Sequence, residues 1–368
     1  MNNPISISLC MIVKNEENNL EACLSSIADI VDEINIVDTG STDKTVEIAK
    51  KYTDRVFFFE WVNDFSAARN FSFSKATKEY IMWLDADDVI YEADRQKLKE
   101  LKSTLSKTVD VVIMDYRYKK DELGNVTVIQ KRARLVKNNK GFKWQGRLHE
   151  NIPIEGKVEI TDIGIDHEHS KPAVSQARNI AMLENVIDTP EENMRDLYYY
   201  VKTLYNENEH DKAMPYLERF VLQNKKEQMP AVDAYLALHY IYLIKEEFEK
   251  AYLCLAENDA LLNTYSEYYC ALGNFSQVLL KDDDTAISYY LKALKATGVT
   301  TGNVAMFAYT KYYYYTPYAA LGDCYMRIGR LEEALEALKK ALEYTDNAAE
   351  IKTTEEKIEQ LKAGLKNI

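Results

Sequence analysis

The sequence predicts an α/β domain with a mostly parallel sheet, followed by an all-α domain built from helical repeats. The chain has 368 residues, more than one ordinary hydrophobic core accommodates. Strand-like and helix-like segments alternate in the front third, which is typical of a sheet whose faces are covered by helices. Beyond about residue 190 the pattern is almost wholly helical. We therefore expect two domains, residues 1–187 and 188–368.

The strands and helices of the front domain follow from their apolar patterns. Continuous apolar runs predict buried strands, whereas helical spacing of apolar residues predicts helices. Strands are expected at residues 5–13, 33–37, 55–61 and 80–84, and helices at 18–28, 43–52 and 65–77, the last capped by Asn63 or Asp64. Alternation at 111–118 and 126–137 predicts an antiparallel pair around the turn Leu123-Gly124-Asn125. Residues 143–165 are also expected to be rich in strands.

Charge and cysteine content exclude several classes of protein. A formal net charge of −13 repels phosphate backbones, so no nucleic-acid partner is expected. The five cysteines form no Cys-x-x-Cys pair, which argues against zinc ribbons and suits a reducing compartment. The sequence shows neither a signal peptide nor an apolar run long enough to span a membrane. The expected location is cytoplasmic.

The helical domain carries a repeat. Its clearest copy matches the tetratricopeptide pattern in register at Tyr318, Leu321, Gly322, Tyr325, Gly329, Ala334, Leu338 and Ala341. The small residue at the helix crossing recurs as Ala213, Ala251, Ala286 and Ala334, at intervals of about 35 to 48 residues against about 34 in the regular repeat. The last interval holds an insertion that contains Tyr312–Tyr315. About four repeats would share one core; the alternative is a generic array of helical hairpins.

Two acidic residues directly follow the fourth expected strand. Asp85 and Asp87 lie in Asp85-Ala86-Asp87-Asp88, after an apolar run. Ligands of open α/β sheets bind at the carboxyl ends of the strands. Two carboxylates on such a loop can share one hard cation with a diphosphate, and Mg²⁺ and Mn²⁺ suit oxygen ligands. The alternative is that these carboxylates only end a strand and cap a helix.

Two further segments place polar groups at the same expected edge. Asp38 follows the second strand, where it can hydrogen-bond a base or ribose, and Gly40 permits the tight turn that follows. A capped turn without ligand is the alternative. Arg69 lies early in the third helix, and its planar guanidinium suits a diphosphate. A structural ion pair with Asp64 is the alternative for Arg69.

Together these motifs resemble family 2 glycosyltransferases of the GT-A fold. The matching segments are Asn15-Glu16 after the first strand, Asp38-x-x-Ser41-x-Asp43, Ala68-Arg69-Asn70 and Asp85-x-Asp87, in the family's order. The resemblance implies inverting transfer of a sugar from a nucleotide-diphosphate sugar, with a UDP-sugar as first choice and Mn²⁺ or Mg²⁺ as the cofactor. It places Val13, Glu16 and Asp38 at the base and ribose, and Arg69, Asp85 and Asp87 at the diphosphate and metal. Lys14 departs from the family, in which many members have an aromatic or apolar residue there.

The segment Trp144-Gln145-Gly146-Arg147-Leu148-His149-Glu150 supplies candidates for the proton acceptor. Its spacing does not fit the His-Glu-x-x-His zinc motif. An inverting transfer needs a carboxylate or imidazole to take the proton of the acceptor, and Glu150 is the first candidate and His149 the second. In similar glycosyltransferases a late histidine ligates the metal, and His167 or His169 matches that part. Structural histidines are the alternative.

The combined architecture is similar to glycosyltransferases fused to tetratricopeptide repeats, among them the peptide S-glycosyltransferases that modify bacteriocins. This resemblance and the concave surfaces of repeat arrays favour a protein or peptide acceptor held in the repeat groove. Two alternatives are a cell-surface saccharide glycosyltransferase and a repeat-containing binding module whose catalytic domain has decayed. Polymer synthesis is not expected, because the sequence has no processive Gln-x-x-Arg-Trp motif. A homodimer is one assembly that the sequence leaves open.

Overall fold

The chain folds into two compact units, Met1–Tyr199 and Tyr200–Ile368. The computed structural model describes residues 4–120, 126–168, 174–224, 228–296, 314–345 and 347–365. The boundary falls within helix α6 (Met194–Asn206), beyond the expected division between residues 187 and 188. The reason is that the start of α6 and the segment before it contact the front unit. Arg147 pairs with Glu191 at 2.6 Å, and Arg195 donates a hydrogen bond to the carbonyl of His149.

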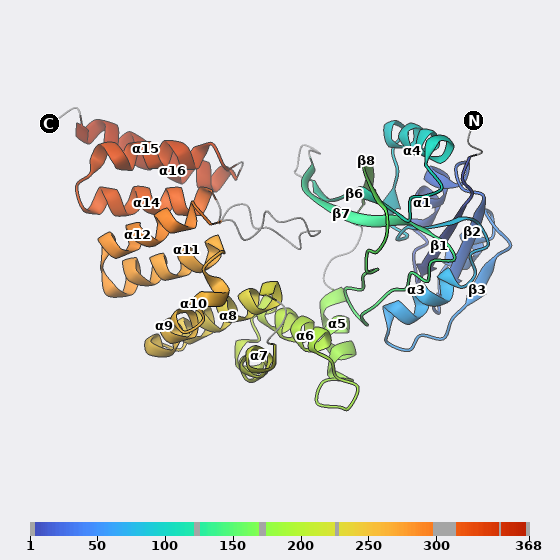
Figure 1. Cartoon of the computed structure of the whole chain (residues 1–368), viewed down its shortest axis with the longest axis horizontal. Helices are drawn as coiled ribbons and strands as arrows, with labels where there is room; N and C mark the ends of the chain where they lie inside the picture. The colour runs from blue at the N-terminus through green and yellow to red at the C-terminus, as the bar shows by residue number, and fades with distance from the viewer. Residues whose placement is uncertain are drawn as a thin grey trace. The chain divides into compact units, whose positions relative to one another are not determined.

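The front unit is built on one mixed sheet. Eight strands from the described residues take the order β3-β2-β1-β4-β7-β6-β8-β5. They are β1 (Ile7–Val13), β2 (Glu33–Asp38), β3 (Val56–Phe58), β4 (Tyr80–Trp83), β5 (Asp88–Val89), β6 (Val111–Lys120), β7 (Val126–Lys137) and β8 (Val158–His167). Strands β1, β2, β3, β6, β7 and β8 are labelled in Figure 1. Strands β1 to β4 are parallel, and β6 and β7 are antiparallel, both as predicted. The turn predicted at residues 123–125 lies outside the described residues.

The prediction of strands across residues 143–165 is largely wrong. Within this segment strand structure begins only at Val158, apart from an isolated bridge between Gln145 and Asn151. The backbone explains the difference, because Gly146, His149 and Gly156 have φ angles of 98°, 52° and 85°. Such left-handed conformations interrupt a strand. The segment instead folds as an irregular loop against helix α3 (Phe65–Phe73), where Phe65 N–H donates to the carbonyl of Arg147.

Helices cover both faces of the sheet, as alternation along β1 requires. Leu9 and Met11 face a core that includes helices α1 (Leu20–Ile27), α2 (Thr45–Ala49) and α4 (Glu92–Thr104). Cys10 faces the opposite core, which α3 and Trp144 complete. Asp64 caps α3 by accepting a hydrogen bond from Ala67 N–H at 2.9 Å, as predicted. Helix α5 (Val174–Glu184) follows the sheet.

The second unit is helical, as predicted. Its described elements are α7 (His210–Gln223), α8 (Gln228–Ile244), α9 (Phe248–Ala256), α10 (Asp259–Leu262), α11 (Ser266–Phe275), the π-helix η1 (Ser276–Leu280), α12 (Asp283–Ala293), α14 (Tyr315–Arg327), α15 (Leu331–Leu342) and α16 (Ala348–Leu365). The alanines expected at the helix crossings are fully buried. Gly322 allows α14 to approach α15, because a Cβ there would lie 2.6 Å from the Leu338 side chain. The expected insertion at Tyr312–Tyr315 lies partly outside the described residues.

Within the described residues, no helix combines the length and the apolar character that crossing a membrane requires.

Candidate active site

The predicted site residues gather at one edge of the sheet, beyond the carboxyl ends of three parallel strands. Val13 and Asp38 pair at the ends of β1 and β2. On the other side of β1, Trp83 at the end of β4 pairs with Cys10, so the loop Asp85–Asp88 follows at the same edge. Because neighbouring parallel strands end at the same edge of the sheet, segments that are far apart in the sequence meet here.

Asp38 shapes the turn in which it lies. Its carboxylate accepts backbone hydrogen bonds from Gly40 at 3.1 Å and Ser41 at 3.2 Å. Gly40 has a φ of 101°, a conformation that side chains disfavour. Across the turn, the Asn15 side chain accepts a hydrogen bond from Thr42 N–H at 2.8 Å, and Glu16 accepts one from Asn19 at 2.7 Å. The turn is thus held in shape by its own polar groups; contacts of Val13, Glu16 and Asp38 with a base or ribose remain a prediction.

Arg69 joins two carboxylates that are distant in sequence. Its Nη2 lies 2.7 Å from Asp85 Oδ1 and its Nε lies 2.6 Å from Glu150 Oε1. The guanidinium also lies against the rings of Trp83 and Trp144, at 5.1 and 4.7 Å from their centroids. The ion pair anticipated with Asp64 is therefore replaced by pairs with these two carboxylates. Contact of Arg69 with a diphosphate stays a prediction. The guanidinium would have to bind the diphosphate while it already pairs with two carboxylates.

These contacts keep both partners of the Arg69–Asp85 pair ionised. Burial alone raises the pKa of Asp85, but the charges of Arg69 and Arg134 outweigh burial and hold that pKa below its ordinary value. Burial lowers the pKa of Arg69, but Asp85 and Glu150 outweigh it and raise that pKa. If the carboxylate of Asp85 or of Glu150 were removed, the buried positive charge of Arg69 would keep only one of its two ion pairs.

A candidate metal centre lies beside this network. Oxygen atoms of Asp87 and Asp88 and a nitrogen of His167 all lie within 4.8 Å of one another. His167 Nδ1 is 3.4 Å from Asp87 Oδ1 and 3.4 Å from Asp88 Oδ1. Burial lowers the pKa of His167, but its hydrogen bonds with the two aspartates and their charges raise the pKa to about 9. The two carboxylates therefore favour the protonated form of His167.

The donor set fits a divalent cation. Carboxylates suit Mg²⁺ and Mn²⁺, and an imidazole among them is a ligand that Mn²⁺ accepts. The structure brings His167 to Asp87, as the sequence predicted, while Asp85 is directed to Arg69 rather than into this cluster. His169, the other predicted ligand, lies outside the described residues.

Asp88 and Arg134 belong to the site although the sequence did not single them out. Both side chains are fully buried, and they pair at 2.8 Å. Asp88 also accepts a hydrogen bond from the backbone N–H of Asp85 at 2.9 Å, and β5 pairs it with His167 on β8. Arg134 lies over the Trp83 ring at 3.8 Å. In the sequence, only the nearness of Arg134 to a second arginine, Arg132, in the expected strand 126–137 could have drawn attention to it.

The two candidate proton acceptors lie in different surroundings. The Glu150 side chain is 11% exposed and is fixed by Arg69 beside Asp85. His149 is exposed, has a φ of 52°, and stacks on Tyr199 with ring centroids 4.3 Å apart. The structure thus brings Glu150, rather than His149, into the network of charged groups at the sheet edge.

Comparison with known proteins agrees with this geometry. Residues 8–155 match the model of Glycosyl transferase family 2, and residues 315–347 match the Tetratricopeptide repeat model. SPbeta prophage-derived glycosyltransferase SunS of Bacillus subtilis (strain 168) is 26% identical over 260 residues, covering 66% of this chain and 60% of SunS. A TPR repeat-containing protein of Synechococcus elongatus is 37% identical over 147 residues, covering 40% of this chain and 35% of that protein. Lipopolysaccharide core biosynthesis glycosyltransferase LpsC of Rhizobium meliloti is 27% identical over 165 residues, covering 42% of this chain and 59% of LpsC.

The predicted combination is confirmed: a family 2 glycosyltransferase domain with an α/β sheet is followed by a helical region that contains a tetratricopeptide repeat. The chain spans about 60% of SunS and less of the other two relatives.

Proposed function

We propose that the chain is an inverting, metal-dependent glycosyltransferase that uses a nucleotide-diphosphate sugar, with a UDP-sugar as the preferred donor. The observation that carries the proposal is the convergence of Asp87, Asp88 and His167 beside the Asp85–Arg69–Glu150 network at the carboxyl edge of the parallel strands. The family match of residues 8–155 and the glycosyltransferase relatives support sugar transfer. Asp87 and His167 would hold Mn²⁺ or Mg²⁺, which supplies positive charge to the leaving diphosphate.

In the proposed reaction the acceptor atom bonds to the anomeric carbon as the bond from that carbon to the diphosphate breaks. Glu150 takes the proton of the acceptor, and the nucleoside diphosphate leaves with the electron pair. Arg69 fixes the position of Glu150, because the guanidinium is itself held by Asp85 and contacts the two tryptophan rings. His149 remains the second candidate for the base.

We further propose a protein or peptide acceptor that binds the repeat unit. The tetratricopeptide match of α14 and α15 supports an interaction with a polypeptide, since such repeats form concave surfaces that bind peptides. A saccharide acceptor is the second candidate, and the similarity to LpsC is the observation that favours it. The cytoplasmic location and the homodimer stay predictions.

Metal binding tests the proposed centre directly. Replacement of Asp87 by asparagine, or of His167 by glutamine, removes one donor of the cluster, and we expect the affinity for Mn²⁺ to fall at least about tenfold. Electron paramagnetic resonance of free Mn²⁺ measures that affinity without any assumption about the substrate. Asp162→Asn is the matched control, since Asp162 lies on β8 with its side chain 80% exposed. Equal Mn²⁺ affinity in all four proteins would contradict the assignment.

A further inference from the structure

The cations nearest the proposed metal centre are already neutralised by carboxylates. Arg69 pairs with Asp85 and Glu150, and Arg134 pairs with the buried Asp88. The Arg134 side chain is fully buried, and Arg69 already shares its single positive charge between two carboxylates. A nucleoside diphosphate carries more negative charge than one divalent cation neutralises. If the proposed transfer occurs here, further positive groups are expected to face the leaving nucleoside diphosphate.

Arg132 is one such group. On β7 it pairs with Met114, which lies on the same face of β6 as Tyr116, and Arg134 contacts the Tyr116 ring at 4.5 Å. The charges of Asp85 and Glu150 act on Arg132 from the neighbouring network. The guanidinium is half-buried, and its only hydrogen bond in the described structure goes to the Gln130 side chain at 2.9 Å.

The electrostatic setting of Arg132 is that of a cation without a counter-ion. Burial and the charge of Arg134 lower its pKa, and the weaker influences of Tyr116, Asp85 and Glu150 do not restore it. No carboxylate of the described residues lies within ion-pairing distance of Arg132. An arginine held near low-dielectric surroundings without such a partner is stabilised when an anion binds.

Arg178 on α5 approaches the same network from another element. Its guanidinium lies 5.3 Å from the centroid of the Phe65 ring, one helical turn before Arg69 on α3. The charge of Glu150 acts on it, although the two side chains form no ion pair. Its hydrogen bond in the described structure goes to the Asn179 side chain at 3.4 Å, and the residue is exposed and open to a ligand.

We infer that Arg132 and Arg178, rather than Arg69, provide the positively charged side chains that bind the diphosphate of the donor. This inference rests on the proposed function and assigns the anion-binding part of the same site. Arg69 then acts as a positioning residue that orders Glu150 and Asp85. The two unpaired arginines and the metal together neutralise the leaving group, while the network of paired charges beside them stays intact.

The test is calorimetric binding of UDP, GDP, ADP and dTDP, and of inorganic pyrophosphate, to the full chain in the presence of Mg²⁺. Loss of a charged hydrogen bond typically weakens binding by about 10- to 100-fold, which is the expected effect of Arg132→Gln and of Arg178→Gln on the nucleoside diphosphate that binds. Arg132→Lys should retain more affinity than Arg132→Gln, since it keeps the charge but loses the planar fork.

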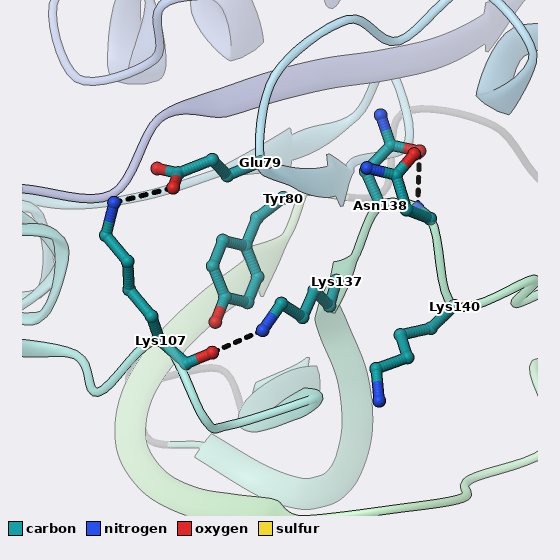
Figure 2. Close-up of a pocket in the computed structure, with 7 residues that line it drawn as sticks. Glu79, Tyr80, Lys107, Lys137, Asn138 and Lys140 are labelled. Atoms are coloured by element: carbon teal, nitrogen blue, oxygen red, sulfur yellow. Dashed lines mark hydrogen bonds and ion pairs between the residues drawn. The ribbon is translucent and has the colours of Figure 1, made fainter.

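A matched control comes from the other end of the strands. The pocket in Figure 2 is lined by Lys107, Lys137 and Lys140, where β4 begins and β7 ends. Lys140→Gln removes the same single charge far from Asp85, and the affinity for the diphosphate should not change. Thermal unfolding of each variant shows whether the fold is retained.

The outcomes separate the inference from the proposed function. Weak binding by both arginine variants, with intact fold and unchanged Lys140→Gln, supports the inference. Wild-type affinity in both Arg132→Gln and Arg178→Gln overturns the inference and leaves the proposed function standing. A wild-type chain that binds none of the four nucleoside diphosphates overturns both.

Discussion

Replacing Glu150 with glutamine is expected to lower turnover for a hydroxyl acceptor by about 10²–10⁴-fold, the usual contribution of a general base. The amide keeps the shape of the side chain and still accepts a hydrogen bond from Arg69, but it takes no proton. Donor affinity should therefore change little, so the loss falls on the chemical step. Steady-state turnover with a hydroxyl acceptor and calorimetric donor affinity measure the two effects separately.

The control for this variant is Glu155→Gln, an exposed carboxylate in the same segment whose loss should leave turnover unchanged. A thiol acceptor would blunt the effect of Glu150→Gln, because a cysteine is partly ionised near neutral pH. If Glu150→Gln turned over a hydroxyl acceptor at the wild-type rate, His149 or another residue would have to be the base. Lost donor affinity would instead make Glu150 a residue that binds the donor.

The second large effect is expected in stability. Arg134→Met removes the partner of a carboxylate that is fully buried, and such uncompensated charges cost about 3–5 kcal/mol. The free energy of unfolding, measured by chemical denaturation, should fall by that amount. Adding Asp88→Asn to Arg134→Met should recover part of the loss, because the amide carries no charge.

The surface ion pair of Lys51 with Glu21 provides the control, since both side chains are about half exposed. Lys51→Met should change stability little, because exposed pairs contribute little. A similar small effect for Arg134→Met would show that the Arg134–Asp88 pair does not organise the edge of the sheet.

Much of the fold could be predicted because local patterns determine it. The apolar runs of β1 and β4 identify buried strands, and their carboxyl ends place Asp85 and Asp87 at the same edge of the sheet as Asp38. The segment 143–157 could not be predicted in this way. Its left-handed residues and its packing on α3 depend on tertiary contacts, such as the hydrogen bond of Ser66 to the carbonyl of Gly146 at 2.6 Å.

The candidate site was predictable as a set of residues but not as a set of contacts. His167 and Asp87 were expected to share a metal, and the structure brings them together. The partners of Arg69 were not predictable, because Glu150 comes from a loop 81 residues along the chain. Asp88 lies in an acidic run that does not distinguish it from its neighbours. Arg132 and Arg134 lie in a strand whose alternation is interrupted by a β-bulge at Arg134.

We propose that a metal held by Asp87 helps this chain to break the bond between the sugar and the nucleoside diphosphate. The most direct measurement is release of the nucleoside diphosphate from a panel of nucleotide sugars by the full chain, in Mn²⁺ and in excess EDTA. We expect release from at least one sugar, greatest with UDP as the nucleotide, abolished by EDTA, restored by Mn²⁺ or Mg²⁺ and strongly reduced in Asp87→Asn. Full activity in excess EDTA, or wild-type activity in Asp87→Asn, would contradict this role of the metal.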